Sequence, residues 1–236
     1  MRVSRGEQPA AGGRRVTERR PGIRDSAVAT GRGDDGTTGL LFGGERVAKD
    51  DPRTEAYGSV DEAVAALGLA RAELAMKDQY GVLTPALATI GELILRFQRE
   101  LFVVGAELAA NPGARDRLQD GVSRVTESMV SGVELALADL ESRVAMPAEF
   151  VVPGESRVSA SIELARTIVR RAERRVVALQ RQGLSGEWTL PYLNRLADYL
   201  WVLARAAEAA ESRDARPARP GARARRGTRG GAAGPA

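Results

Sequence analysis

FVVPGESRVSASIELARTIVRRAERRVV, residues 150–177, is the segment that decides the predicted fold. Its first residues contain Pro153 and Gly154 and are typical of an extended connection, whereas the apolar residues from about Ser159 recur with helical spacing. A helix therefore begins near this serine. At about 100° per residue its buried face consists of apolar side chains. They are Ile162, Ala165, Ile168, Val169, Ala172, Val176 and Leu179.

A second stripe of the same helix is charged. Arg166, Arg170 and Glu173 follow one another at helical spacing, about a quarter turn or more from the apolar face. Two arginines one turn apart could bind a polyphosphate, because the guanidinium fork matches phosphate oxygens and stays charged. The alternative is a solvated face with an ion pair between Arg170 and Glu173, which is the commoner situation on helices. The pattern leaves both open.

The first helix of the chain is predicted from a capping box. Ser59 and Glu62 have the spacing in which each side chain satisfies a backbone amide at a helix N-terminus. An apolar stripe follows this box. Asp61 would lie in the first turn, where a carboxylate is favoured by the helix dipole.

The remaining helices follow from caps and proline positions. One is expected to begin at Thr84–Pro85, another to cover about residues 126–144, and the last to begin near Leu190–Pro191. The last helix carries Asn194 and Asp198 one turn apart, off its leucine stripe. Short loops between long amphipathic helices predict an all-α fold, a five-helix antiparallel bundle of the ferritin-like up-down type. No sheet larger than a hairpin is expected.

The composition excludes several classes of enzyme. The chain of 236 residues contains no Cys and no His. This rules out thiol nucleophiles, Ser-His-Asp triads and the usual zinc sites, which require imidazole or thiolate groups. A metal would have to be bound by oxygen atoms, and Mg²⁺ accompanying a nucleotide is the natural candidate.

The distribution of charge predicts the domain organisation. Seven arginines against three acidic residues give residues 1–26 a net charge of +4, and seven against one give residues 212–236 a net charge of +6. Because the whole chain carries +4, residues 27–211 carry −6. We interpret residues 27–211 as the helical bundle domain. The two flanking segments, rich in Arg, Gly, Pro and Ala, are expected to be disordered tails.

The tails also bear on partners and location. Arginine-rich segments bind nucleic acid nonspecifically, but no aromatic residue is interleaved here to stack on bases, so nucleic acid is an unlikely partner. No apolar segment resembles a secretory signal or approaches the length of a membrane span. We expect a cytoplasmic protein with no membrane association.

Residues 29–51, ATGRGDDGTTGLLFGGERVAKDD, form a glycine-rich and polar segment. The glycines between residues 31 and 36 match the dinucleotide-binding spacing, but the glycines that follow prevent the helix which that motif requires. The Walker A spacing is also present, with Thr37 in place of its lysine. What remains is a loop of amides and hydroxyls followed by Lys49, which could hold phosphates. An ordinary surface loop is equally compatible.

Three groups of motifs together resemble one family. They are TGRGDDGTT with FGGERVAKDDPRTEAYGSVDE, FVVPG with ARTIVRRAERRVV, and YLNRLADYLWVLAR. These motifs closely resemble the propanediol-utilisation (PduO) type of ATP:cob(I)alamin adenosyltransferase, also called corrinoid adenosyltransferase. The resemblance covers about residues 28–208. The arginine motif and Y-L-N-R-L-x-D are its most specific parts.

The resemblance implies a five-helix bundle that assembles as a homotrimer, with active sites between neighbouring subunits. The implied reaction transfers the 5′-deoxyadenosyl group of ATP to the cobalt of cob(I)alamin, giving adenosylcobalamin and triphosphate. Cob(I)alamin is itself the nucleophile, which agrees with the absence of His and Cys. An alternative is a carrier that holds adenosylcobalamin and delivers it to a mutase, with catalysis secondary. Implied partners are a flavoprotein or flavodoxin-type reductase and an adenosylcobalamin-dependent mutase.

The resemblance also implies roles for individual residues. Asp61 would pair across the interface with Arg166, Asp198 would support the site, and Phe150 would cover the lower face of the corrin ring. In one subunit, the residues matching the ATP loop are Thr30, Gly33, Asp34, Gly36, Thr37, Thr38 and Lys49. In the adjacent subunit, the residues matching the rest of the site are Arg166, Arg170, Glu173, Asn194 and Arg195.

The chain departs from the family pattern at four positions within or near the matching motifs. Gly31 replaces a lysine that is usual in the loop, and Arg32 beside it is a candidate substitute. Glu155 and Ser156 replace a glycine pair found in many members, and Glu163 stands where a histidine is often found. The arginine motif itself is intact.

Overall fold

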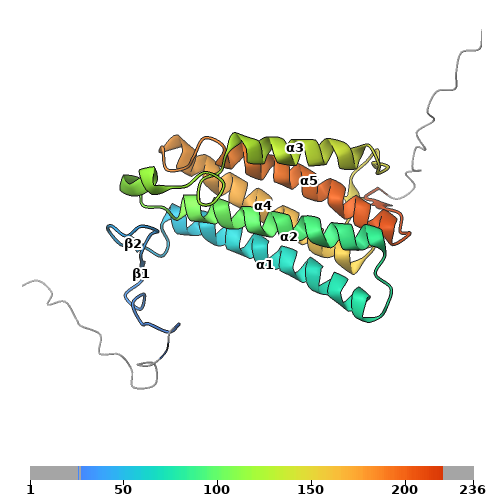
Figure 1. Ribbon diagram of the computed structural model, residues 1–236, viewed down its shortest axis with the longest axis horizontal. Helices are drawn as coiled ribbons and strands as arrows, with labels where there is room; N and C mark the ends of the chain where they lie inside the picture. Colours follow the sequence, from blue (N-terminus) through green and yellow to red (C-terminus); the bar gives the residue numbers. More distant parts are fainter. Residues whose placement is uncertain (1–25, 27, 220–236) are drawn as a thin grey trace, which may run out of the picture.

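The computed structural model describes residue 26 and residues 28–219, and these form an antiparallel helical bundle with small strand pairs at its ends (Figure 1). Residues 1–25 and 220–236, which make up most of the two predicted tails, lie outside the described residues. The all-α prediction is confirmed. The helices are α1 (Pro52–Gln79), α2 (Pro85–Leu108), α3 (Glu127–Glu141), α4 (Arg157–Arg181) and α5 (Thr189–Ala210), with a short 3₁₀ helix, η2 (Pro112–Arg117).

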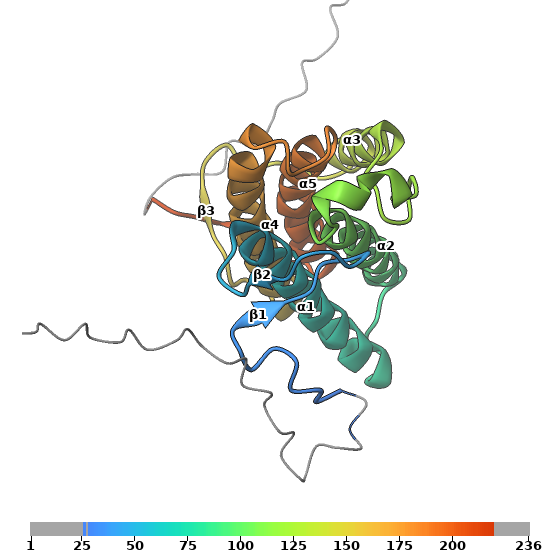
Figure 2. The same ribbon diagram turned by 90° about the vertical axis from the view of Figure 1, so that its left-hand side faces the viewer.

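Helix α4 packs against two other helices. It lies against α1 on one side and α5 on the other, while α2 packs on α1 and α3 packs on α5 (Figure 2). Its predicted apolar stripe is fully buried, apart from Ile168, which is half-buried. Burial of this stripe between two neighbouring helices supplies the hydrophobic stabilisation that fixes the orientation of the charged stripe.

The predicted start of the first helix is wrong. Helix α1 begins at Pro52, where Asp51 accepts a hydrogen bond from the backbone amide of Arg53 at 2.9 Å. Ser59 is buried inside the helix and its hydroxyl donates to the carbonyl of Glu55. Asp51–Pro52 and Ser59 with Glu62 are both typical of a helix N-terminus. The helix begins at the upstream segment, because a proline at the first helical position needs no partner for a backbone amide. Asp61 consequently lies in the third turn of α1.

The starts of α2 and α4 lie closer to the positions predicted from the sequence. Thr84 caps α2 by accepting from the amide of Leu87, with Pro85 in the first turn as predicted. Ser156 caps α4 by accepting from the amide of Ser159 at 3.1 Å, which places the helix start slightly upstream of the expected serine. Helix α3 ends at Glu141, a few residues before the expected end.

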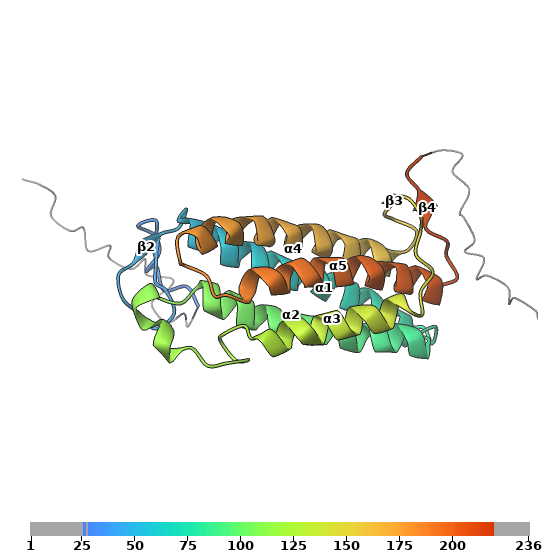
Figure 3. The ribbon, with the colours of Figure 1, turned by 90° about the horizontal axis from the view of Figure 1, so that it is seen from above.

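The strands lie at opposite ends of the bundle (Figure 3). β1 (Thr37–Thr38) pairs antiparallel with β2 (Val47–Ala48) at the end where α1 begins. β3 (Val151–Val152) pairs antiparallel with β4 (Arg216–Pro217) at the other end. β4 comes from the segment that the sequence analysis assigned to the C-terminal tail, so ordered chain continues beyond α5. Among the described helices, none is both long and apolar enough to cross a membrane.

Candidate functional site

The glycine loop lies at the end of the bundle where α1 begins (Figure 3). Gly36 has a φ of +80°, a left-handed conformation that favours glycine, and its carbonyl accepts from the amide of Lys49 at 2.9 Å. The Lys49 ammonium lies against Gly33, where an added Cβ would come within 2.8 Å of Nζ. The structure therefore places the Lys49 ammonium against the loop. A side chain at Gly33 would have to displace the ammonium group.

Two residues that the sequence analysis did not single out hold the loop in shape. The Arg46 guanidinium donates to the Thr37 hydroxyl at 2.7 Å and to the carbonyls of Arg32 and Thr37 at 2.8 and 2.9 Å. Asp35 accepts from the hydroxyl and the amide of Thr37, and these hydrogen bonds, led by the hydroxyl, hold the pKa of its carboxyl below the usual value. The Thr37 hydroxyl thus donates one hydrogen bond to Asp35 and accepts another from Arg46.

The other loop residues of the predicted site have local roles. The Thr30 hydroxyl accepts from the amide of Arg32 at 3.4 Å, and the Asp34 amide donates to the carbonyl of Gly31 at 3.3 Å. Thr38 lies in β1 and pairs with Val47. The Asp34 carboxylate is exposed.

A third residue, Asn111, attaches this segment to the bundle. Its side-chain amide donates to the carbonyl of Gly43 at 2.6 Å, and a Cβ on Gly44 would collide with it. The Leu41 amide donates to the carbonyl of Ala109 just after α2. No local pattern predicts the contact of Asn111 with Gly43 or those of Arg46 with the loop, because these partners are distant in the sequence.

The charged stripe of α4 meets the start of α5. The side-chain amide nitrogen of Asn194 donates to Glu173 at 3.1 Å, and the side-chain oxygen of Asn194 accepts from Arg195 at 2.7 Å. Arg195 also pairs with Glu134 of α3 at 2.9 Å. The structure therefore brings together Glu173, Asn194 and Arg195. The alternative of an Arg170 to Glu173 ion pair is wrong for the described chain, because Glu173 bonds to Asn194 instead.

Arg170 is the exposed cation of this stripe. Within residues 28–219, no ion pair or hydrogen bond engages its side chain, and its backbone carbonyl accepts from Arg174 at 3.2 Å. Asp198, farther along α5, is exposed as well. Arg170 is thus available to a ligand without losing an internal contact.

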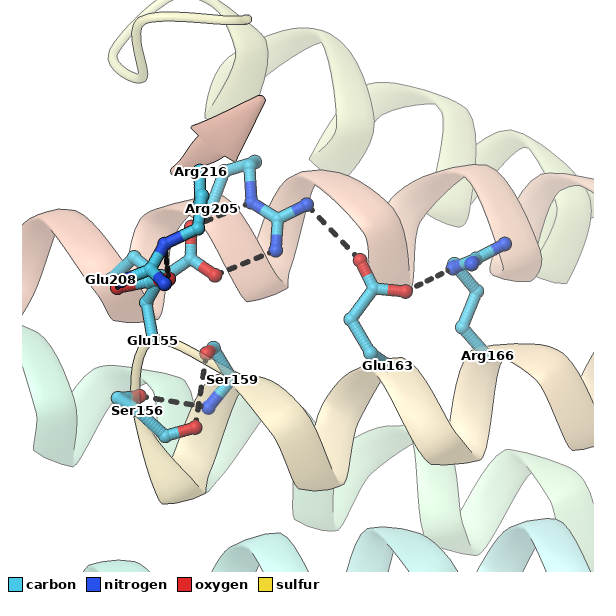
Figure 4. A network of polar contacts seen from close by, with 8 residues as sticks. All are labelled: Glu155, Ser156, Ser159, Glu163, Arg166, Arg205, Glu208 and Arg216. Atoms are coloured by element: carbon cyan, nitrogen blue, oxygen red, sulfur yellow. Dashed lines mark hydrogen bonds and ion pairs between the residues drawn. The ribbon is translucent and has the colours of Figure 1, made fainter. Parts of the chain in front are cut away.

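Arg166 is held from inside the bundle. Its Nε donates to Glu163 at 2.6 Å, and Glu163 is buried between α4 and α5 (Figure 4). Asp61 is exposed on α1 and has no ion-pair partner in the described part of the chain, whereas its neighbour Glu62 pairs with Arg171. The predicted contact between Asp61 and Arg166 is therefore not made within one subunit.

Phe150 lies at the other end of the bundle, just before β3 (Figure 3). Its side chain is 89% exposed and lines a cavity of about 440 Å³ together with Trp201 and Arg219. Its carbonyl accepts from the amide of Ala218, so the strand pair of β3 and β4 holds its backbone. One subunit consequently does not bring Phe150 next to the glycine loop.

The predicted site residues therefore form separate groups in one chain. No hydrogen bond or ion pair among the described residues joins the glycine loop to the cluster on α4 and α5. The described chain also has no group of three or more acidic residues placed to bind a metal ion. An Mg²⁺ ion does not require such a group, because it commonly takes one or two carboxylates and completes its shell with water and substrate phosphates.

The fold and these clusters define a helical-bundle protein with an exposed arginine on α4 and a glycine loop backed by lysine, two features suited to phosphate groups. A family model described as Cobalamin adenosyltransferase matches residues 28–207. The chain belongs to this family.

Known relatives agree with this assignment. A corrinoid adenosyltransferase of Bacillus subtilis (strain 168) is 40% identical over 176 residues, covering 75% of this chain and 83% of the relative. A corrinoid adenosyltransferase of Citrobacter freundii is 36% identical over 181 residues, covering 77% and 94%. A variant of a PduO-type ATP:corrinoid adenosyltransferase from Lactobacillus reuteri, complexed with cobalamin and ATP, aligns with a TM-score of 0.70 at 27% identity, covering 82% of this chain and 97% of that one.

Proposed function

We propose that this protein transfers the 5′-deoxyadenosyl group of ATP to the cobalt of cob(I)alamin, giving adenosylcobalamin and triphosphate. The observation that carries the proposal is the family match over residues 28–207, within which the arginine stripe of α4 and the glycine loop are both present. The similar corrinoid adenosyltransferases and the related structure complexed with cobalamin and ATP support the same reaction.

In the proposed reaction, the protein's contribution is placement and charge stabilisation. Co(I) attacks the 5′ carbon of ATP, a cobalt–carbon bond forms, and the bond from that carbon to the triphosphate oxygen breaks. The electron pair of that bond stays on the oxygen that joined the carbon to the α-phosphate, so negative charge develops there as triphosphate leaves. Cations aimed at that charge lower the barrier more than they stabilise bound ATP. We assign this role to Lys49 on the loop and Arg170 on α4, both of which are exposed.

The groups that are separate in one chain would come together in a homotrimer. We infer that the glycine loop of one subunit faces the α4 and α5 cluster of its neighbour. Asp61 is exposed and forms no ion pair with any other described residue, and this supports the arrangement, because Arg166 of an adjacent subunit would give it a partner. Asn194 and Arg195, which already bond to each other, would then face the nucleotide together with Glu173. Asp198, one turn farther along α5, would support this cluster.

Phe150 is proposed to shape the corrin side of the site. An exposed aromatic ring beneath cobalt would exclude water and the displaced base, and Co(I) prefers the four-coordinate state that this exclusion produces. For a one-electron couple, each tenfold preference shifts the potential by about 59 mV. The nearly full exposure of Phe150 in one chain leaves it accessible for such a contact.

Mg²⁺ would enter with ATP and neutralise part of the phosphate charge. The cell would have to supply reduced corrinoid through a flavoprotein or flavodoxin-type reductase and use the product in an adenosylcobalamin-dependent mutase. These partners and a cytoplasmic location are proposals that follow from the reaction.

The test is a stoichiometric assay with purified protein, ATP, Mg²⁺ and chemically reduced cob(I)alamin. Formation of adenosylcobalamin, followed by its absorbance, should equal release of triphosphate, and both should continue over many turnovers. A protein that bound adenosylcobalamin tightly but released no triphosphate would be a carrier, and the proposed activity would be wrong.

A further inference from the structure

A chain of four charged side chains connects the interior of the bundle to Arg166 (Figure 4). Arg205 of α5 donates to both carboxylate oxygens of Glu208 at 2.8 and 2.7 Å, and to Glu163 of α4 at 3.1 Å. The other oxygen of Glu163 accepts from Nε of Arg166 at 2.6 Å. The side chains of Glu163, Arg205 and Glu208 are only 2–4% exposed. Nothing in the reaction described above uses these three residues.

The balance of charge explains why Arg166 belongs to this network. Two buried carboxylates share one buried arginine, which would leave an uncompensated negative charge at Glu163. An unpaired buried charge is strongly destabilising, whereas a second arginine completes the pairing. Each oxygen of Glu163 accepts from one of the two arginines. Arg166 is therefore held in place by the interior.

The atom through which Arg166 is held determines what its guanidinium presents outward. Glu163 accepts a hydrogen bond from Nε of Arg166, and among the described residues no hydrogen bond engages the two terminal nitrogens of this guanidinium. The side chain remains 23% exposed, and in Figure 4 the guanidinium extends away from Glu163. The two terminal nitrogens can donate side by side to a carboxylate or a phosphate.

We propose that Glu163 is a positioning residue, which fixes the Arg166 guanidinium in an orientation in which a terminal nitrogen can donate to ATP phosphates. The inference rests on the proposed function. Glu163 is buried behind Arg166 and does not touch the substrate. A free arginine side chain loses rotamer entropy when it binds a ligand. Glu163 already restricts the Arg166 side chain before binding, so less entropy is lost when ATP binds.

The matched pair of variants is Glu163→Gln and Glu208→Gln. Each removes one buried negative charge from the same network by an isosteric change. Only the first replaces one of the two oxygens that accept from Arg166 and Arg205 by an NH2 donor, so Glu163 can no longer hold both arginines. We expect both to lower the melting temperature. Only Glu163→Gln should weaken ATP binding, by about tenfold, the effect of a charge-assisted hydrogen bond at the lower end of its range. The apparent KM for cob(I)alamin should stay unchanged. Glu163→Asp, which keeps the charge, should recover most of the ATP affinity.

ATP affinity is measured by calorimetry on the folded assembly without corrinoid, and light scattering checks the subunit number. If Glu163→Gln does not fold, the variant Glu163→Leu with Arg205→Met and Glu208→Leu replaces the buried charges by apolar groups. It should fold and still bind ATP more weakly.

Equal ATP affinity in Glu163→Gln and Glu208→Gln, or normal affinity in the folded triple variant, would overturn the inference and leave the proposed function intact. If the unaltered protein bound no ATP and formed no adenosylcobalamin, the proposed function itself would be wrong.

Discussion

Replacement of Arg170 by alanine should separate activity from stability. Arg170 is exposed on α4, and no ion pair or side-chain hydrogen bond engages it among the described residues. Its removal should therefore change the free energy of unfolding by no more than about 0.5 kcal/mol, as is usual for surface positions. For a domain of this size, the melting temperature should shift by roughly 1–2 °C.

The effect on the reaction should be far larger. A hydrogen bond to a charged group contributes about 1.5–3 kcal/mol, which corresponds to roughly 10- to 150-fold in ATP affinity. If the contact strengthens as charge leaves with triphosphate, turnover should fall by more than the affinity for ATP. Arg170→Lys should be intermediate, because it keeps the charge but not the guanidinium fork.

Arg174 offers a matched control on the same helix. It is exposed one turn away, and within the described residues its side chain makes one polar contact, the 3.2 Å hydrogen bond to the Arg170 carbonyl. Arg174→Ala thus removes the same charge from the same face. Steady-state kinetics, calorimetry with ATP and thermal unfolding should be compared for both variants. Equal effects on ATP affinity and turnover would refute the assignment of Arg170, as would a loss of stability large enough to explain its defect.

Three other perturbations test the remaining assignments. Alanine at Asp61 and at Arg166 should each reduce kcat/KM, and a double-mutant cycle should give a coupling energy of about 0.5–3 kcal/mol, whereas strict additivity would argue against a contact between subunits. Phe150→Ala should leave ATP binding unchanged but abolish the four-coordinate cob(II)alamin signal in electron paramagnetic resonance, and a retained signal would contradict its role. A chain ending at residue 219 should stay active, whereas one ending at residue 211 lacks the β4 partner of the strand after Phe150 and should bind corrinoid more weakly. Equal corrinoid affinity of the two would show that β4 does not matter for this site.

The sequence by itself determined the helices and most of their limits. Apolar side chains that recur every three or four residues define one face of a helix, and this signal is local. It identified the buried stripe of α4 and, with it, the direction of the arginines. The caps at Thr84 and at Ser156 are local as well, and the predicted helix starts lie within a few residues of them.

The first helix shows where local signals become ambiguous. Asp51–Pro52 and Ser59 with Glu62 both have the character of an N-terminus, and Gly58 between them weakens the case for a continuous helix. Tertiary contacts favour the longer helix, because Ala56 is fully buried and the Thr54 hydroxyl donates to the carbonyl of Lys49. Packing outweighs the helix propensity of one glycine.

The partners of the charged residues were decided only by the tertiary structure. Arg205 is 42 residues from Glu163 in the sequence, and Arg46 reaches an oxygen 14 residues away. Whether such groups meet depends on how α4 packs on α5 and how the glycine segment folds back on itself. Glu163 stands three residues before Arg166, a spacing at which two side chains of one helix can pair. That Glu163 is buried and shared with Arg205 depends on the packing of α4 on α5. The interior of the bundle imposes that pairing, because a charge removed from water requires a partner.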